Sequence, residues 1–189
     1  MTAAAFAFDE PRADTGVALC AGRWLLLSGI VFGTANLIQW GVLSGALDLH
    51  PAFLALNWAV AVGVFVTGQV RLRRTGGEAA RRVAGWSRAF ILAHLCLAIT
   101  LAGISNALGD WGLMRWTSVV GLGLYAAGWA MAAVRTGTSN MGVLCLVALG
   151  GSAAAAVSVS TPDQYLTQAF TLGLVALLPG LWLAIGRRL

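Results

Sequence analysis

Six apolar stretches, each close to twenty residues long, run through this chain of 189 residues. A helix rises about 1.5 Å per residue, so roughly 20 apolar residues cross the ~30 Å hydrocarbon core of a bilayer. The pattern therefore predicts an all-α integral membrane protein with six transmembrane helices. The expected spans are residues 24–46, 52–70, 89–108, 113–134, 141–159 and 165–186. They form one domain over residues 23–189, which follows an N-terminal tail over residues 1–22.

Composition supports a membrane environment. The chain is 59% hydrophobic and only 10% charged, with a mean hydropathy of +0.81, whereas soluble domains carry about 25% charged residues. The first sixteen residues combine three acidic side chains with one arginine and have no apolar core. We therefore expect no cleaved signal peptide there, and the short connections between spans leave no room for a separate soluble domain.

The arginines predict the orientation of the chain. All twelve basic residues are arginine, and only Arg115 falls on one side of the expected bundle. Basic loops stay on the cytoplasmic side of a membrane, so the spans form three consecutive hairpins with both termini cytoplasmic. Arginine in place of lysine is typical of GC-rich bacterial genomes, which favours the bacterial inner membrane. The eleven arginines on the cytoplasmic side are Arg12, Arg23, Arg71, Arg73, Arg74, Arg81, Arg82, Arg88, Arg135, Arg187 and Arg188.

Polar side chains inside the first hairpin are the best candidates for a site. Asn36, Gln39 and Trp40 belong to the first expected span and Asn57 to the second. Polar groups in hydrocarbon are costly unless they find partners. Counting residues from each span centre puts Gln39 and Asn57 at nearly equal depth, so the two amides could hydrogen-bond across the hairpin. They either hold the helices together or contact a solute.

Histidine and acidic side chains suggest little chemistry. His94 lies on the cytoplasmic side of the midplane of the third span, where it is either a neutral packing residue or a pH-sensitive group. Asp48 and His50 share an outer turn, but neither a nucleophile nor a further metal ligand stands at useful spacing. We therefore predict no catalytic site, no metal site and no bound cofactor.

Small residues at a spacing of four suggest close helix packing. Gly29 and Gly33 form one such pair in the first span, and Gly41 and Gly45 form a second. Four residues advance a helix by about 40°, so the two pairs lie on different faces and favour two different neighbours. Those neighbours are helices of the same chain, or a second copy or another protein. The fifth span offers a similar surface at Gly150, Gly151, Ala154 and Ala155.

The densest charge in the chain lies between the second and third spans. The six arginines there are expected to face anionic lipid headgroups, which attract juxtamembrane arginine by about 1 kcal/mol each. Docking of a cytoplasmic protein is the alternative. A nucleic-acid partner is not expected, because the segment is short and resembles no nucleic-acid-binding fold. The six residues are Arg71, Arg73, Arg74, Arg81, Arg82 and Arg88.

Two functions remain open from the sequence. The first is a non-enzymatic membrane module that senses, regulates or stabilises a partner through helix packing, which fits the glycine-rich faces and the scarcity of buried charge. The second is a small-solute channel, transporter or transporter subunit whose polar site lies in the outer half of the first hairpin. A membrane enzyme would require His50 or Asp48 to be essential for turnover.

Overall fold

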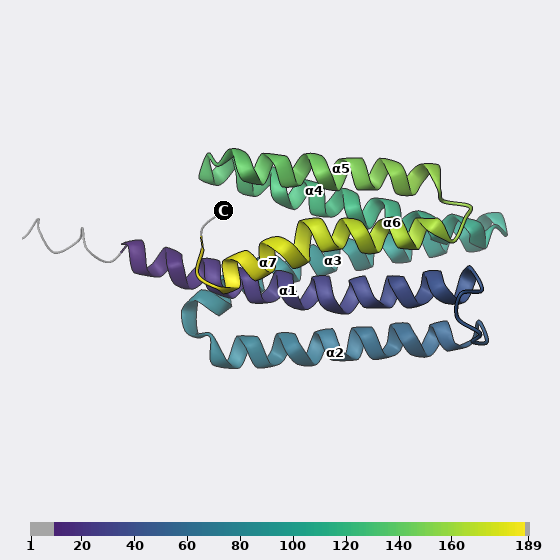
Figure 1. The fold of residues 1–189 in the computed structure, drawn as a ribbon, viewed down its shortest axis with the longest axis horizontal. Coiled ribbons are helices and arrows are strands. Elements are labelled where there is room, and N and C mark those ends of the chain that lie inside the picture. The colour runs from purple at the N-terminus through teal and green to yellow at the C-terminus, as the bar shows by residue number, and fades with distance from the viewer. Residues whose placement is uncertain (1–9, 188–189) are drawn as a thin grey trace, which may run out of the picture.

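The computed structural model describes residues 10–187, with side chains from residue 16 onward. Within this range every regular element is a helix, and six helical segments are long and apolar enough to cross a membrane. Figure 1 shows them side by side along the long axis of the molecule. The elements are α1 (Glu10–Leu43), α2 (Phe53–Thr75), α3 (Gly77–Leu108), η1 (Trp111–Arg115), α4 (Trp116–Thr136), α5 (Ser139–Val157), α6 (Asp163–Leu172), η2 (Gly173–Leu177) and α7 (Leu178–Ala184).

Two helices extend well beyond the expected spans. α1 begins at Glu10 rather than near residue 24, and α3 begins at Gly77 rather than near residue 89. Hydropathy marks only the part of a helix that lies in hydrocarbon, whereas Ala, Arg and Glu favour helix in water as well. At 1.5 Å per residue α3 is about 48 Å long. The arginine-rich segment is therefore helical except at Gly76, whereas residues 1–9 of the expected tail and Arg188 lie outside the described residues.

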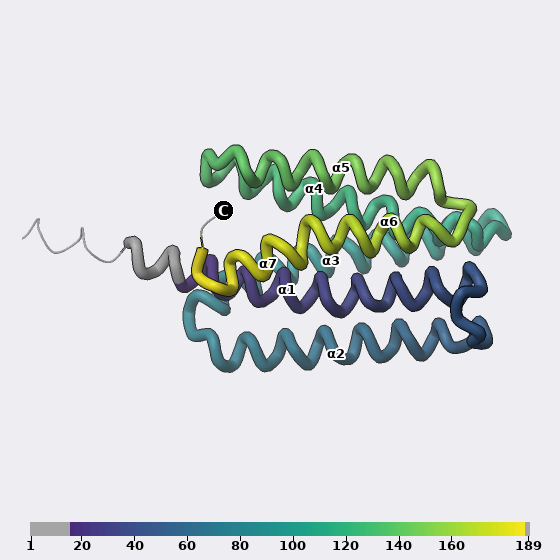
Figure 2. Tube along the Cα trace, in the orientation of Figure 1, coloured from purple at the N-terminus to yellow at the C-terminus, as the bar shows by residue number. Residues whose placement is uncertain are grey.

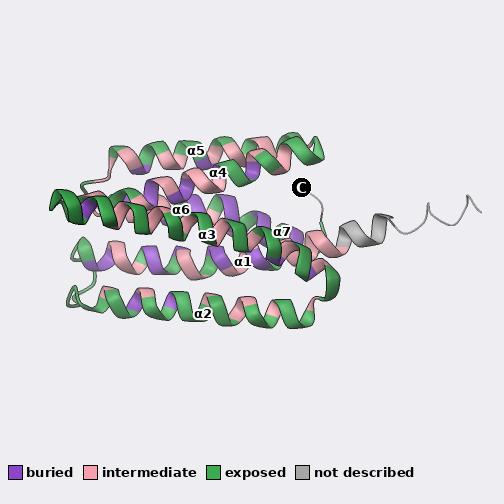
Figure 3. Ribbon diagram, turned by 180° about the vertical axis from the view of Figure 1, so that it is seen from behind, coloured by how far each residue is buried: buried purple, intermediate pink, exposed green. Residues whose placement is uncertain are grey.

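α1 is the central helix of the bundle. It contacts α2, α3 and the whole of the last span, while α4 and α5 form another tightly packed pair. Figure 2 traces α1 between α2 on one side and α6 and α7 on the other. The buried apolar core includes Leu122, Ala148 and Val175. Figure 3 shows exposed residues along the outer faces of α2 and α3, and large apolar side chains are common among them, as lipid-facing helices require.

The last span is a broken helix. α6 and α7 are joined by a π-helical turn, η2, and Pro179 follows at the start of α7. Proline has no N–H to give to the carbonyl four residues earlier, which belongs to Val175. That carbonyl instead accepts a hydrogen bond from the buried Trp129 Nε1 of α4, at 3.0 Å. A side chain from a neighbouring helix thus satisfies the backbone group that the proline leaves free.

Glycines bring the backbones of α1 and the last span close together. A Cβ added to Gly29 would lie 2.7 Å from the backbone nitrogen of Leu177, and one added to Gly180 would lie 2.4 Å from that of Leu26. Gly22, which the sequence analysis did not select, meets the backbone of Ala184 in the same way, at 2.6 Å. Gly22 and Gly29 therefore come from α1 and Gly180 from α7, so both sides of this contact contribute glycine.

The four glycines selected from the sequence lie in different surroundings within the chain. Gly29 is the only one of the four residues at a helix crossing, because a Cβ on Gly33 would meet nothing within 4 Å and one on Gly41 would meet the Leu47 side chain of its own turn. Gly45 lies beyond the end of α1 and has a φ of +78°. The second pair therefore terminates a helix instead of packing against one.

Candidate functional site

The predicted polar residues link α1 to α2 in two places. The Asn57 Nδ2 of α2 donates to the backbone oxygen of Ala35 at 3.0 Å in a buried contact. One residue along, the Trp58 Nε1 donates to the Gln39 Oε1 at 2.5 Å. Gln39 and Asn57, which could have bonded to each other, instead each have a separate partner across the hairpin. Both amides hold the first two helices together.

The start of α6 completes this cluster, which the sequence analysis did not anticipate. The Trp40 Nε1 donates to the Asp163 Oδ1 at 3.2 Å, and the Tyr165 hydroxyl lies beside the Gln39 amide. The Gln164 Nε2 donates to the backbone oxygen of Arg115, where η1 leads into α4. A signal was present in the sequence, since Gln164 and Gln168 stand four residues apart on one helix face. Side chains from α1, α2 and α6 therefore meet in one polar cluster.

Four buried oxygen atoms in this part of the bundle have no hydrogen-bond partner. They are the Asn36 Oδ1, the Ser105 Oγ, the Gln164 Oε1 and the Gln168 Oε1. Three of these residues, Asn36, Ser105 and Gln164, are fully buried. A buried polar atom left without a partner costs about 1–3 kcal/mol. The three amide oxygens are acceptors, and the chemical groups that suit them are donors such as water, hydroxyl, ammonium or amide N–H, whereas the Ser105 hydroxyl can both donate and accept.

The register of α1 against α6 brings two of these oxygen-bearing residues to the same level. Trp40 is bonded to Asp163, and Phe32 packs against the cluster that contains Leu172. Because the two helices run in opposite directions, Asn36 lies level with Gln168, midway between those contacts. The Asn36 Nδ2 donates within its own helix, to the Phe32 oxygen at 2.7 Å, which leaves its own oxygen unpartnered.

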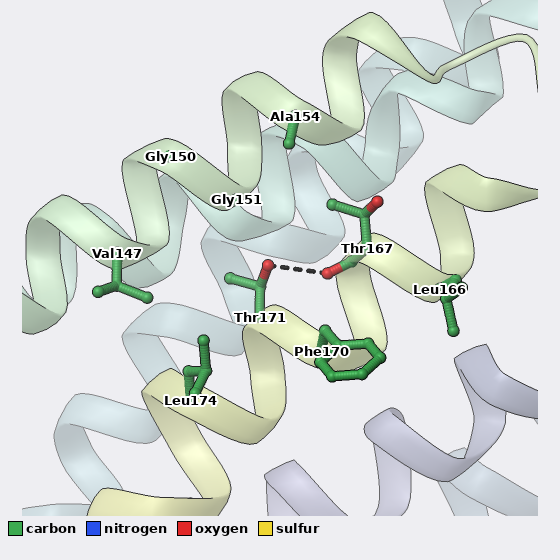
Figure 4. A pocket seen from close by; sticks show the side chains of 9 residues that line it. All are labelled: Val147, Gly150, Gly151, Ala154, Leu166, Thr167, Phe170, Thr171 and Leu174. Atoms are coloured by element: carbon green, nitrogen blue, oxygen red, sulfur yellow. Dashed lines mark hydrogen bonds between the residues drawn. The ribbon is translucent and has the colours of Figure 1, made fainter.

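A separate groove runs between α5 and the last span. It measures about 410 Å³ and is bordered by small residues of α5, with threonines and larger apolar side chains opposite. Figure 4 shows Gly150 and Ala154 on α5 facing Thr167 and Phe170 across it. The Thr171 hydroxyl donates to the Thr167 backbone oxygen at 2.8 Å, so it needs no external partner.

Adjacent small residues of α5 have different roles. Gly151 packs against the Thr171 side chain, where an added Cβ would come within 2.8 Å of its Cβ, and Ala155 is fully buried. Gly150 and Ala154 are exposed, and nothing lies within 4 Å of a Cβ added to Gly150. The small-residue surface predicted from the sequence thus divides in two. Gly151 and Ala155 pack inside the monomer, whereas Gly150 and Ala154 face outward.

The remaining candidates lie elsewhere in the bundle. His94 is half-buried on α3, and its imidazole lies over Gly121 of α4, far along the helix from the polar cluster. Arg82 pairs with Glu78 at 2.9 Å on the exposed surface of α3. Arg73 and Arg88 line a second pocket beside Trp24. Among the described residues, no three His, Cys, Asp or Glu side chains gather closely enough to hold a metal ion.

These features define a class of protein rather than a reaction. Six helices that can each cross a bilayer, with lipid-facing apolar surfaces and a polar cluster inside, make this a multi-pass membrane protein. Comparisons with protein-family models, with curated proteins and with solved structures found no match to this chain. The features of this chain that bear on function are the groove, the polar cluster and the arginine-rich end.

Proposed function

We propose that this chain is a bacterial inner-membrane protein that works without catalysis, by packing the outer face of α5 and α6 against a transmembrane helix of a partner protein. The observation that carries the proposal is the groove of about 410 Å³ between these helices. Gly150 and Ala154 stand four residues apart on its exposed edge. Small residues at this spacing let a second helix backbone approach closely in lipid.

A comparison with the neighbouring small residues of α5 supports the proposed packing of a partner helix. Gly151 already accommodates Thr171 of the neighbouring helix at close range. Gly150 and Ala154 offer the same kind of surface on the outside, where lipid chains are the only competitor for the groove. A partner helix could also receive hydrogen bonds from Thr167, whose hydroxyl has no bond to another described side chain. The proposal concerns one occupant, a partner helix.

The proposed orientation is that of three consecutive hairpins with both termini in the cytoplasm. Its support is the placement of the arginines: the turn between α2 and α3 and the last residues of α4 carry them, whereas the turns at the opposite end contain Asp48, Asp110 and Asp163. The groove then lies within the hydrocarbon. A transmembrane helix is consequently a better match for it than a soluble protein.

Site-specific photo-crosslinking tests the groove. A photoreactive residue at Ala154 is expected to capture one membrane protein in fixed stoichiometry, and Gly150→Leu, which fills the groove, should reduce that product about tenfold. The matched control is a photoreactive residue at Ala127, an exposed small residue on α4. Capture of lipid alone, or of the same products from both positions, would refute the proposal. Capture of a second copy of this chain would show that the groove is an interface between identical chains. It would refute the proposal that the partner is a different protein.

The unpartnered oxygens favour a second candidate, a small-solute channel or transporter. Solutes that donate hydrogen bonds, such as urea or ammonium, complement the acceptors of Asn36, Gln164 and Gln168. On this hypothesis the polar cluster would be a solute-binding site in the outer half of the bundle. The hydrogen bonds of Asn57 and Gln39 between α1 and α2 would hold that site in position.

Flux through proteoliposomes distinguishes this candidate from the first. If the cluster is a solute site, Asn36→Leu should abolish the light-scattering response of proteoliposomes to urea or ammonium chloride. Assembly should survive, because the substitution removes an oxygen that has no partner. Asn106→Leu, at an exposed position of α3, serves as the control. A parent protein without flux for either probe, or equal flux in parent and Asn36→Leu, would eliminate the transport hypothesis.

A further inference from the structure

A small pocket lies between α1, α2 and α3, near the arginine-rich end of the bundle. Its polar lining consists of Trp24 from α1, Gln69 and Arg73 from α2 and Arg88 from α3; the other lining residues are apolar. The pocket measures about 120 Å³. Liquid water takes about 30 Å³ per molecule, so this space matches about four oxygen atoms. A tetrahedral oxyanion has that size.

The pocket carries positive charge without a compensating carboxylate. No acidic side chain lines it, and within residues 16–187 the single ion pair joins Arg82 to Glu78. Arg73 and Arg88 approach the pocket from two different helices and have no partner of their own there. Arg73 and Arg88 are exposed residues that line the pocket from α2 and α3. Two arginines beside one pocket favour an anion there, because arginine forms charge-assisted hydrogen bonds with phosphate oxygens.

Trp24 provides an independent indication of a ligand. Its side chain is only 6% exposed, and its Nε1 is buried with no hydrogen-bond acceptor. An indole N–H that is buried normally finds a partner. Gln69, by contrast, is anchored across the helix pair, because its Nε2 donates to the Ser87 Oγ at 3.2 Å. The pocket therefore combines two unpaired cations with one unsatisfied neutral donor, and an acceptor is the missing component.

We propose that this pocket binds a phosphate group, with Arg73 and Arg88 contributing charge and the Trp24 Nε1 contributing a neutral hydrogen bond. The phosphate belongs either to an anionic lipid headgroup at the cytoplasmic surface or to free phosphate in solution. Only this pair of the six clustered arginines lines the pocket. The site is therefore a specific one, distinct from a general attraction of arginines to the membrane, and it does not depend on a partner helix in the groove of α5 and α6.

Lipid binding to paired double variants tests the proposal. Arg73→Gln/Arg88→Gln removes both pocket cations, whereas Arg71→Gln/Arg81→Gln removes the same charge from the same two helices outside the pocket. The probes are phosphatidylglycerol and phosphatidylcholine added to delipidated protein, with binding measured by native mass spectrometry. We expect the pocket variant to lose about tenfold in affinity for phosphatidylglycerol and the control variant to lose less than about threefold.

Two further measurements separate the sources of phosphate and the role of the tryptophan. Trp24→Phe keeps an aromatic ring but removes the N–H, and should weaken phosphatidylglycerol binding about threefold to tenfold in protein that remains folded. Calorimetry with inorganic phosphate forms the second arm. Phosphate binding that depends on Arg73 and Arg88, without a preference for phosphatidylglycerol, would support the site and identify free phosphate as its ligand.

The proposal is overturned by either of two results. One is an equal loss of phosphatidylglycerol affinity in the pocket and control variants, since general surface charge would then explain the binding. The other is that neither phosphatidylglycerol nor inorganic phosphate responds to Arg73→Gln/Arg88→Gln in protein that remains folded. Both double variants carry the same net charge, so a difference between them reports position alone.

Discussion

Gly29→Ala is expected to destabilise the protein by about 2–3 kcal/mol, because the new methyl group would overlap the backbone of the last span. The added Cβ would lie 2.7 Å from the backbone nitrogen of Leu177 and 2.9 Å from its Cα. Neither atom can rotate away as the end of a side chain can. α1 or the last span must shift, and α1 is the helix that most of the bundle packs against. Unfolding in mixed detergent, followed by tryptophan fluorescence, measures the change.

Gly33→Ala is the matched control on the same helix, four residues away. A Cβ there would meet nothing within 4 Å, so the substitution should gain the helix propensity of alanine, up to about 1 kcal/mol, without a clash. The two changes are chemically identical and differ only in the surroundings of the methyl group. Equal effects of Gly29→Ala and Gly33→Ala would contradict the close approach between α1 and the last span.

The difference between these glycines also shows what sequence spacing can and cannot predict. A separation of four residues indicates that two small residues share a helix face, but it does not identify the helix opposite. Gly22 and Gly29, seven residues apart, meet Ala184 and Leu177 of the last span, which lie about 150 residues or more further along the chain. The antiparallel register of α1 and the last span determines which glycines lie at the close contact between them.

The six spans were predictable because hydrocarbon imposes its thickness on any helix that crosses it. All six occur in the structure, with most apolar boundaries within a few residues of the expectation. The exceptions are the polar helix ends, such as the stretch after Gly77, where hydropathy falls although the backbone stays helical. Apolar composition therefore located the membrane-crossing parts, and helix propensity, which hydropathy ignores, determined where the helices begin.

The polar cluster was predictable in part. The cost of a polar group in hydrocarbon pointed to Asn36, Gln39, Trp40 and Asn57, and counting residues put Gln39 and Asn57 at a similar depth in the first two spans. Their partners were not accessible to the same argument. Asp163 bonds to Trp40 across 123 positions of sequence, and Gln164 reaches a backbone oxygen of η1. Such contacts depend on which helices become neighbours, and depth alone does not settle that.

Single cysteines on opposite ends of the bundle are expected to differ in an all-or-none manner when intact cells are treated with a membrane-impermeant maleimide. In a background with Cys20, Cys96 and Cys145 replaced by alanine, Ser160→Cys should be labelled and Thr75→Cys should not. Both positions are exposed, so accessibility within the protein does not separate them. The physical reason is the cost of carrying arginine through hydrocarbon, about 2.5–3.5 kcal/mol per residue at the helix centre.

Permeabilised cells provide the control for this experiment, since both cysteines should then react at similar rates. The orientation matters for each proposed site, because Arg73 and Arg88 can meet a cytoplasmic anionic leaflet only if the turn at Gly76 faces the cytoplasm. Equal labelling of Thr75→Cys and Ser160→Cys in intact cells would place both ends in one compartment. Labelling of Thr75→Cys alone would show that the orientation is the reverse of the one proposed. The polar cluster beside Asp163 would then lie in the cytoplasmic half of the membrane.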